Sequence, residues 1–119
     1  MFIDFTENIN PESLSPQTEF EEKVISFLKE WYSSVPKVSV QTSGSTGIPK
    51  VFEIEKNKML NSARMTCDFL NLKEGDTALL CLPVEYISGK MMVVRALKRK
   101  LRLTVATPTA KPAQDLEVF

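Results

Sequence analysis

The order of apolar patterns along the chain constrains its fold more than any other feature of the sequence. Apolar residues recur with the 3.6-residue period of a helix that buries one face, and the spacing predicts a first helix over residues 16–33. Ser15 is expected to cap this helix, with Pro16 at its first position. The same period predicts a second helix over residues 57–71 and a third over residues 88–100.

Four short segments between these helices have the pattern of strands. Residues 38–41 and 51–55 alternate between apolar and polar side chains, as half-buried strands do. Residues 77–82 form a continuous apolar run, which is typical of a strand buried on both faces of a parallel sheet. Residues 101–106 give another strand. The strand–helix–strand–helix–strand order predicts an α/β fold with right-handed crossover connections.

The composition is that of one globular domain. A chain of 119 residues of which 43% are hydrophobic can bury a core. Residues 1–14 are expected to be irregular, and residues 109–119 loosely ordered. Fifteen basic and fifteen acidic residues cancel, so no overall charge points to nucleic acid or a membrane surface. The first residues lack a secretory signal and no apolar run approaches the roughly 20 residues of a membrane span, so the expected location is cytoplasmic.

Rare residue types exclude several kinds of chemistry. The chain has no histidine, which excludes histidine-containing zinc sites, Ser-His-Asp triads and imidazole acid–base catalysis. Cys67 and Cys81 form no CxxC motif, and we expect both thiols to be reduced and buried. The basic cluster 98–100 has no interleaved aromatic residues, so we expect cations at a helix C-terminus rather than a nucleic-acid site.

Residues 42–50 combine four hydroxyl side chains, two glycines and a lysine. Glycines let successive backbone N–H groups converge on one anion, and hydroxyls and a lysine add donors for a phosphate. The alternative is a plain hairpin loop, but such loops usually have two to five residues and this one is longer. The segment is not a Walker A loop, because Pro49 disfavours a helix and the residues after Lys50 alternate as a strand. We therefore expect an anion site between two strands.

Two segments resemble sequence motifs of the adenylate-forming superfamily, which includes acyl-CoA synthetases, luciferases and peptide-synthetase adenylation domains. Residues 42–50, Thr-Ser-Gly-Ser-Thr-Gly-Ile-Pro-Lys, resemble its phosphate-binding signature, and residues 80–89 resemble its Leu-Pro-x-x-His-x-x-Gly segment. The Ile-Ser-Gly form of the second segment is most similar to o-succinylbenzoate–CoA ligases of menaquinone biosynthesis. The resemblance implies that residues 1–119 are a partial N-terminal AMP-binding domain, the first part of a layered α/β/α domain, with the C-terminal domain absent.

The resemblance also implies a two-step reaction. A carboxylate attacks the α-phosphate of MgATP to give acyl-AMP and pyrophosphate, and the thiol of coenzyme A then displaces AMP. A carboxylate is already an anionic nucleophile, so this step needs positioning and charge neutralisation more than a general base. No catalytic or metal-binding residue is assigned, and the chain alone is expected to be inactive. By resemblance, the phosphates would contact Thr42, Ser43, Gly44, Ser45, Thr46, Gly47 and Lys50, and the acyl substrate would lie beside Tyr86, Ser88 and Gly89.

Several alternatives stay open at this stage. Tyr86 stands where many relatives have histidine, and it either forms an aromatic wall of the acyl site or packs under the sheet. Lys90 is a candidate cation for a second carboxylate of the acid. The expected partners are the acid, ATP and coenzyme A, and a homo-oligomer is open. The alternative functions are a non-catalytic nucleotide-binding module and an interaction domain that docks through residues 98–102.

Overall fold

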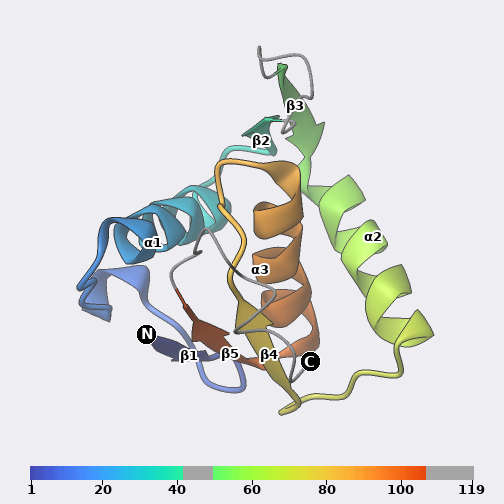
Figure 1. Cartoon of the computed structure of the whole chain (residues 1–119). Coiled ribbons are helices and arrows are strands. Elements are labelled where there is room, and N and C mark those ends of the chain that lie inside the picture. Colours follow the sequence, from blue (N-terminus) through green and yellow to red (C-terminus); the bar gives the residue numbers. More distant parts are fainter. Residues whose placement is uncertain (42–49, 107–119) are drawn as a thin grey trace.

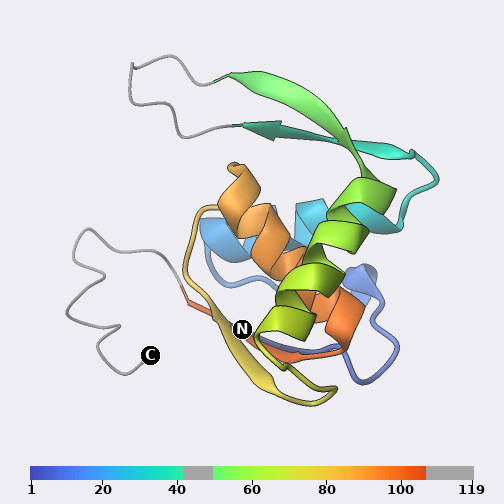
Figure 2. The same cartoon turned by 90° about the vertical axis from the view of Figure 1, so that its right-hand side faces the viewer.

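The computed structural model describes residues 1–41 and 50–106 (Figure 1). Three helices stand over a small sheet, and a separate hairpin lies at the far end of the central helix, as both cartoon views show (Figures 1 and 2). In chain order the elements are β1 (Phe2–Asp4), the 3₁₀ helix η1 (Pro11–Ser13), α1 (Glu19–Tyr32), β2 (Lys37–Gln41), β3 (Val51–Glu55), α2 (Lys56–Phe69), β4 (Thr77–Leu80), α3 (Ile87–Arg99) and β5 (Arg102–Val105).

The sheet has the strand order β1-β5-β4. β4 and β5 are parallel and are connected by α3, which is the β–α–β unit expected from the sequence. β1 pairs with β5 in the antiparallel sense, and Ile3 lies opposite Leu103. Both of these side chains are buried on the face that the helices cover, whereas Phe2 is 56% exposed. The sheet therefore has one covered face and one open face within the described residues.

Helix α1 begins later than the sequence predicts. Thr18, not Ser15, is its N-cap, and the Thr18 hydroxyl accepts a hydrogen bond from the Glu21 backbone N–H at 3.1 Å. Pro16 therefore lies before the helix and not at its first position. A hydroxyl beside an acidic first turn is as good a cap as a Ser-Pro pair, and this chain offers both. The predicted apolar stripe is confirmed, with Val24 and Leu28 fully buried.

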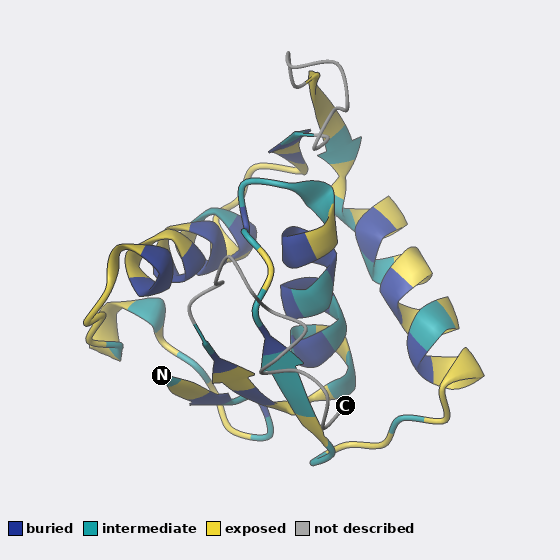
Figure 3. Ribbon diagram, viewed as in Figure 1, coloured by how far each residue is buried: buried dark blue, intermediate teal, exposed yellow. Residues whose placement is uncertain are grey.

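Helix α3 is the centre of the packing. It lies between α1 and α2, with α2 running along its side (Figures 1 and 2). Figure 3 shows that the buried residues of the three helices face one another and the sheet. α3 ends as expected with Lys98 and Arg99 in its last turn, where cations stabilise the negative end of the helix dipole. Lys100 follows in the left-handed conformation (φ 56°), and this residue turns the chain into β5.

The first fourteen residues are only partly irregular, in contrast to the sequence-based expectation. They contain β1 and η1, and β1 is held by the amino group of Met1, which lies 3.2 Å from a Glu21 carboxylate oxygen and 3.3 Å from the Val105 carbonyl oxygen. A strand of three residues is too short for its alternation to be recognised in the sequence. It forms because β5 offers an edge to pair with.

The strand predicted over residues 77–82 is shorter than expected and has a different position in the sheet. β4 ends at Leu80 and is an outer strand within the described residues. Cys81 is therefore half-buried, not part of the core, whereas Cys67 is buried as predicted. Residues 109–119, which were expected to be loosely ordered, lie outside the described residues. No helix in the described part of the chain is long and apolar enough to cross a membrane.

Candidate functional site

The expected phosphate-binding segment is flanked by a hairpin of two antiparallel strands. β2 pairs with β3, and the last pair before the loop is Gln41 with Val51. The segment therefore lies between two paired strands in the order of the chain, as the sequence predicts. Lys50 is exposed immediately before β3. The other phosphate-contacting candidates lie outside the described residues, and they are Thr42, Ser43, Gly44, Ser45, Thr46 and Gly47.

Lys56 fixes the base of the hairpin to the end of helix α1. Its ammonium group donates to the carbonyl oxygens of Glu30 and Ser33, both at 3.0 Å. Carbonyl groups at a helix C-terminus have no partner within the helix, so a cation placed there satisfies them. The same ammonium group lies 5.8 Å from the centre of the Trp31 ring, within the range of a cation–π contact. These contacts set the position of the hairpin relative to the helical core.

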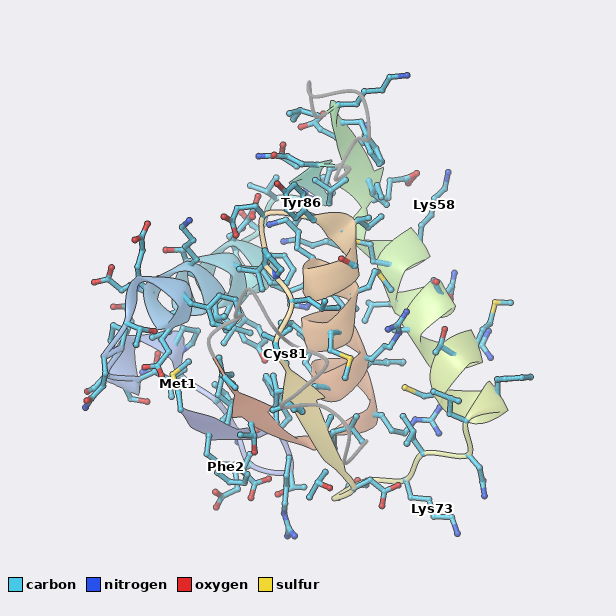
Figure 4. The ribbon with its side chains drawn as sticks, viewed as in Figure 1. Met1, Phe2, Lys58, Lys73, Cys81 and Tyr86 are labelled. Carbon is cyan, nitrogen blue, oxygen red and sulfur yellow. The ribbon has the colours of Figure 1, made fainter. Side chains whose placement is uncertain are left out.

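A backbone bridge links the residue before the first motif segment to the second motif segment. Gln41, the residue before Thr42, forms a parallel β-bridge with Tyr86. Tyr86 lies where the chain turns into α3 (Figure 4), beside the end of β2 that is farther from Lys56. Gln41 and Tyr86 are distant in the sequence, and the bridge brings the residue before the first segment beside the second segment.

The N-terminus of α3 lies at this junction. Tyr86 is the N-cap residue, and no side chain of the described residues bonds to the helix end there. The first N–H groups of a helix have no partner within the helix and carry partial positive charge, so an anion is favoured beside them. Ser88 is exposed in this first turn and adds a hydroxyl. Tyr86 is half-buried, which leaves its aromatic-wall role a prediction.

Gly89 is buried, and its position has a packing reason that does not involve a substrate. A Cβ atom at Gly89 would lie 2.2 Å from the Pro83 carbonyl oxygen and 3.0 Å from the Leu82 carbonyl oxygen. Helix α3 can therefore approach the segment after β4 only because residue 89 has no side chain. The expected place of Gly89 beside the acyl substrate stays a prediction.

Lys90 points toward α1, and its side chain is buried there. Its ammonium nitrogen lies 4.6 Å from the centre of the Phe27 ring, and a pocket of about 250 Å³ adjoins it. Burial lowers the pKa of the Lys90 ammonium group, and the nearby carboxylates of Glu30 and Glu85 oppose this shift. Glu85 itself pairs with Lys23 at 2.9 Å, which holds the pKa of the Glu85 carboxyl below its usual range.

Sequence reasoning missed two residues of this site. Gln41 and Lys56 match no motif, and their importance comes from contacts with Tyr86 and with the end of α1, which are distant in the sequence. Gln41 had one usable signal, its place just before the hydroxyl-rich segment. Lys56 had none, because a lysine at the start of a helix is usually solvated.

Comparison with known proteins points in the same direction as this geometry. No family model matches the chain, and no curated protein matches it. A solved structure does match, that of an acyl-CoA synthetase (AMP-forming)/AMP-acid ligase II-like protein from Dyadobacter fermentans. The two chains are 33% identical with a TM-score of 0.83, and the match covers 98% of this chain.

The chain has the fold of part of an adenylate-forming ligase domain. The α/β fold class expected from the sequence is thereby confirmed. The match covers 33% of the Dyadobacter protein, so this chain spans about a third of that relative's length. The likeness supports the adenylate-forming superfamily, and the 33% identity extends the support beyond the fold alone.

Proposed function

We propose that the chain supplies the phosphate-binding part of an AMP-forming acid–CoA ligase. The observation that carries this proposal is the bridge between Gln41 and Tyr86, which places the residue before the first motif segment beside a residue of the second motif segment. A plain hairpin loop does not require residues 80–89 beside it. A site that binds both MgATP and an acid requires the phosphate-binding residues and the acid-binding residues to lie close together. The likeness to the Dyadobacter ligase-like protein supports the same proposal.

In the proposed reaction, a carboxylate oxygen of the acid attacks the α-phosphorus of MgATP and pyrophosphate leaves. The sulfur of coenzyme A then attacks the acyl carbonyl carbon, and AMP leaves with the electrons of the acyl–oxygen bond. The role of this chain is to hold the β- and γ-phosphates through residues 42–47 and Lys50. These groups position the nucleotide and neutralise the charge that the leaving pyrophosphate gains. Because the chain spans about a third of the relative, we propose that turnover requires a longer ligase.

We propose o-succinylbenzoate as the acid. The support is the Ile-Ser-Gly sequence at the start of α3, together with the exposed Ser88 hydroxyl beside the half-buried Tyr86. An aromatic acid can stack on a tyrosine ring, and a hydroxyl and the positive end of a helix can both bind a carboxylate. Lys90 is not included in this proposal, because its ammonium group is directed toward Phe27 on α1.

The first test measures ATP binding by the chain itself with calorimetry. Hydrogen bonds to charged groups contribute about 1.5–3 kcal/mol, so Lys50→Ala should weaken binding about tenfold or more. Lys58→Ala is the matched control, because Lys58 is also exposed and lies in the first turn of α2 near the same strand. Both variants should unfold at the temperature of the parent chain. Equal weakening by the two variants would refute the role of Lys50.

The second test decides between a ligase and a non-catalytic nucleotide-binding module. A chimaera is made in which this chain replaces the matched third of the Dyadobacter protein, and pyrophosphate release is measured with o-succinylbenzoate and with benzoate. Release that depends on o-succinylbenzoate would support both the reaction and the acid. Pyrophosphate release with other acids but not with o-succinylbenzoate would refute the proposed acid and support the proposed reaction. ATP binding without release for any acid would favour the non-catalytic module.

A further inference from the structure

A pocket of about 250 Å³ lies between helix α1 and the segment that leads into α3. The α1 residues that line it include Lys23, Phe27 and Glu30. The segment before α3 and the first turn of α3 contribute Val84, Glu85 and Lys90. Four of these six residues carry a charge, so the pairing of the charges decides what the pocket can bind.

Two of the four charges are already paired within the protein. The Lys23 ammonium nitrogen lies 2.9 Å from a Glu85 carboxylate oxygen and 3.6 Å from an oxygen of Glu19 in the same helix. This pairing holds the pKa of the Glu85 carboxyl below its usual range. The charges of Lys23 and Glu85 are therefore compensated without a ligand.

Lys90 is the third charge, and its ammonium group has no hydrogen bond or ion pair with any residue in the described part of the chain. The residue is only 9% exposed, and its nitrogen lies 4.6 Å from the centre of the Phe27 ring. A cation–π contact leaves the three N–H donors of an ammonium group without an acceptor. A buried charge is unfavourable unless it is paired and hydrogen-bonded, so Lys90 requires an acceptor, and the pocket has room for one.

Glu30 is the fourth charge, and its carboxylate forms no ion pair within residues 1–41 and 50–106. This carboxylate raises the pKa of the Lys90 ammonium group, so the two charges are near each other. Because no ion pair joins them directly, a group that lies between them can bond to both. The pocket therefore offers one unpaired cation and one unpaired anion.

A ligand that carries charges of both signs matches this arrangement. A carboxylate alone would be attracted to Lys90 and repelled by Glu30, and an amine alone would experience the reverse. An α-amino acid has both groups, and hydrogen bonds between charged partners are stronger than those between neutral ones. The pocket is smaller than the roughly 300–1,000 Å³ of sites for drug-sized ligands, which suits a molecule as small as one amino acid.

We propose that this pocket binds a free amino acid with an apolar side chain. The carboxylate of the ligand accepts hydrogen bonds from Lys90, and the ammonium group of the ligand donates to the Glu30 carboxylate. The side chain of the ligand packs against Phe27 and Val84, which are apolar residues of the lining. The inference does not depend on the proposed function, because it uses no group that is proposed to contact ATP or the acid.

The first experiment compares three probes by calorimetry on the full chain near neutral pH. L-Leucine carries both charges, isocaproate lacks the ammonium group, and isoamylamine lacks the carboxylate. L-Leucine should bind, and each analogue should bind at least about tenfold more weakly, because each loses hydrogen bonds to a charged group. In NMR titrations, bound L-leucine should raise the pKa of the Lys90 ammonium group, since a carboxylate partner opposes the effect of burial.

The second experiment removes each charged partner in turn. Lys90→Met keeps the apolar stem of the side chain, and it should weaken L-leucine binding at least about tenfold without weakening isoamylamine binding. Glu30→Gln should weaken L-leucine binding by a similar factor without weakening isocaproate binding. Lys98→Met and Glu22→Gln are the matched controls, because they make the same changes on exposed residues of α3 and α1 outside the pocket. Each control should change the affinity for L-leucine less than about twofold.

Each other outcome would overturn the proposal. Equal affinities for L-leucine and isocaproate would make the pocket a site for simple carboxylates, and L-leucine binding that Lys90→Met leaves unchanged would place the ligand elsewhere. No binding of any probe at millimolar concentration would mean that water alone fills the pocket. Circular dichroism shows which variants fold, and if Lys90→Met does not, Glu30→Gln at a half-buried position still decides. ATP binding by the chain is measured separately, so failure of this site is distinguishable from failure of the proposed function.

Discussion

Replacement of Gly89 by alanine tests how the start of α3 is positioned. The added Cβ atom would lie 2.2 Å from the Pro83 carbonyl oxygen and 2.7 Å from the Pro83 carbonyl carbon. Non-bonded carbon atoms are in optimal contact at about 3.5–4.0 Å, so helix and segment must separate by roughly 1 Å or more. The obstructing atoms belong to the backbone and cannot rotate away as a flexible side chain would. We therefore expect Gly89→Ala to displace the first turn of α3 from the segment after β4.

The magnitude follows from two opposing contributions to the free energy of unfolding. Overpacking of a close contact costs about 1–3 kcal/mol, and backbone obstruction places this substitution in the upper half of that range. Alanine is more favourable than glycine inside a helix by about 0.8–1.0 kcal/mol, which offsets part of the cost. The expected result is a loss of about 1–2 kcal/mol. For a domain of 119 residues, 1 kcal/mol corresponds to about 4 °C, so the melting temperature should fall by about 4–8 °C.

The assay is thermal unfolding followed by circular dichroism, with Ser88→Ala as the matched control. Ser88 is the preceding residue and is exposed, so its replacement tests the gain in helix propensity without the steric cost. We expect the control to stay within about 0.5 kcal/mol of the parent chain. A melting temperature for Gly89→Ala at or above that of Ser88→Ala would show that α3 does not depend on this close contact, and the argument from packing would be wrong.

Two further predictions concern charge and thiol chemistry. The Arg99 guanidinium holds the pKa of the Asp68 carboxyl below its usual range, so the ionised carboxylate stabilises the fold above its ordinary pKa, and this contribution is lost as the pH falls through the lower pKa of the folded state. The free energy of unfolding of Asp68→Asn, measured by urea titration, should therefore depend less on pH below about pH 4 than that of the parent chain. The same pH dependence in both proteins would contradict the pairing. Burial raises the pKa of the Cys67 thiol, so iodoacetamide at pH 8 should alkylate the half-buried Cys81 first, and Cys67 only when urea is added. Mass spectrometry measures the two rates of alkylation, and equal rates would argue against the burial of Cys67.

The regular part of the fold could be predicted from the sequence. The helix α1, the strand β2 and the β4–α3–β5 unit follow from apolar periodicity, because their apolar residues are buried on one face. The alternation of β3 also predicted a strand, although its apolar residues Val51 and Phe52 are exposed and not half-buried as expected. The prediction failed for β1, whose three residues form a strand only through pairing with β5. It also failed at the start of α1, where two caps competed and Thr18 was the one used. Local pattern does not contain the information that decides either case.

The candidate site was predictable in its parts but not in its assembly. The candidate phosphate-binding segment and the start of α3 were identified from residue types that the proposed chemistry requires, namely hydroxyls, glycines and a lysine. The Gln41–Tyr86 bridge and the contact of Lys56 with the end of α1 depend on packing between residues distant in the sequence, which a sequence motif does not indicate. The role of Lys90 as a cation for a second carboxylate stays a prediction. Its ammonium group lies 4.6 Å from the centre of the Phe27 ring and adjoins a pocket.

The site is more sensitive to displacement of α3 than the rest of the fold is. The hairpin belongs to one sheet and β4 to another, and among the described residues the bridge from Gln41 to Tyr86 is the backbone pairing between the hairpin and the second motif segment. Tyr86 is also the N-cap of α3, so any movement of the first turn of α3 moves the bridge. The core of α3, with Val93 and Val94 fully buried, holds the remainder of the helix in place. Gly89→Ala should therefore weaken ATP binding by more than the increased unfolded fraction accounts for, because displacement of the Gln41–Tyr86 bridge adds to the loss of stability.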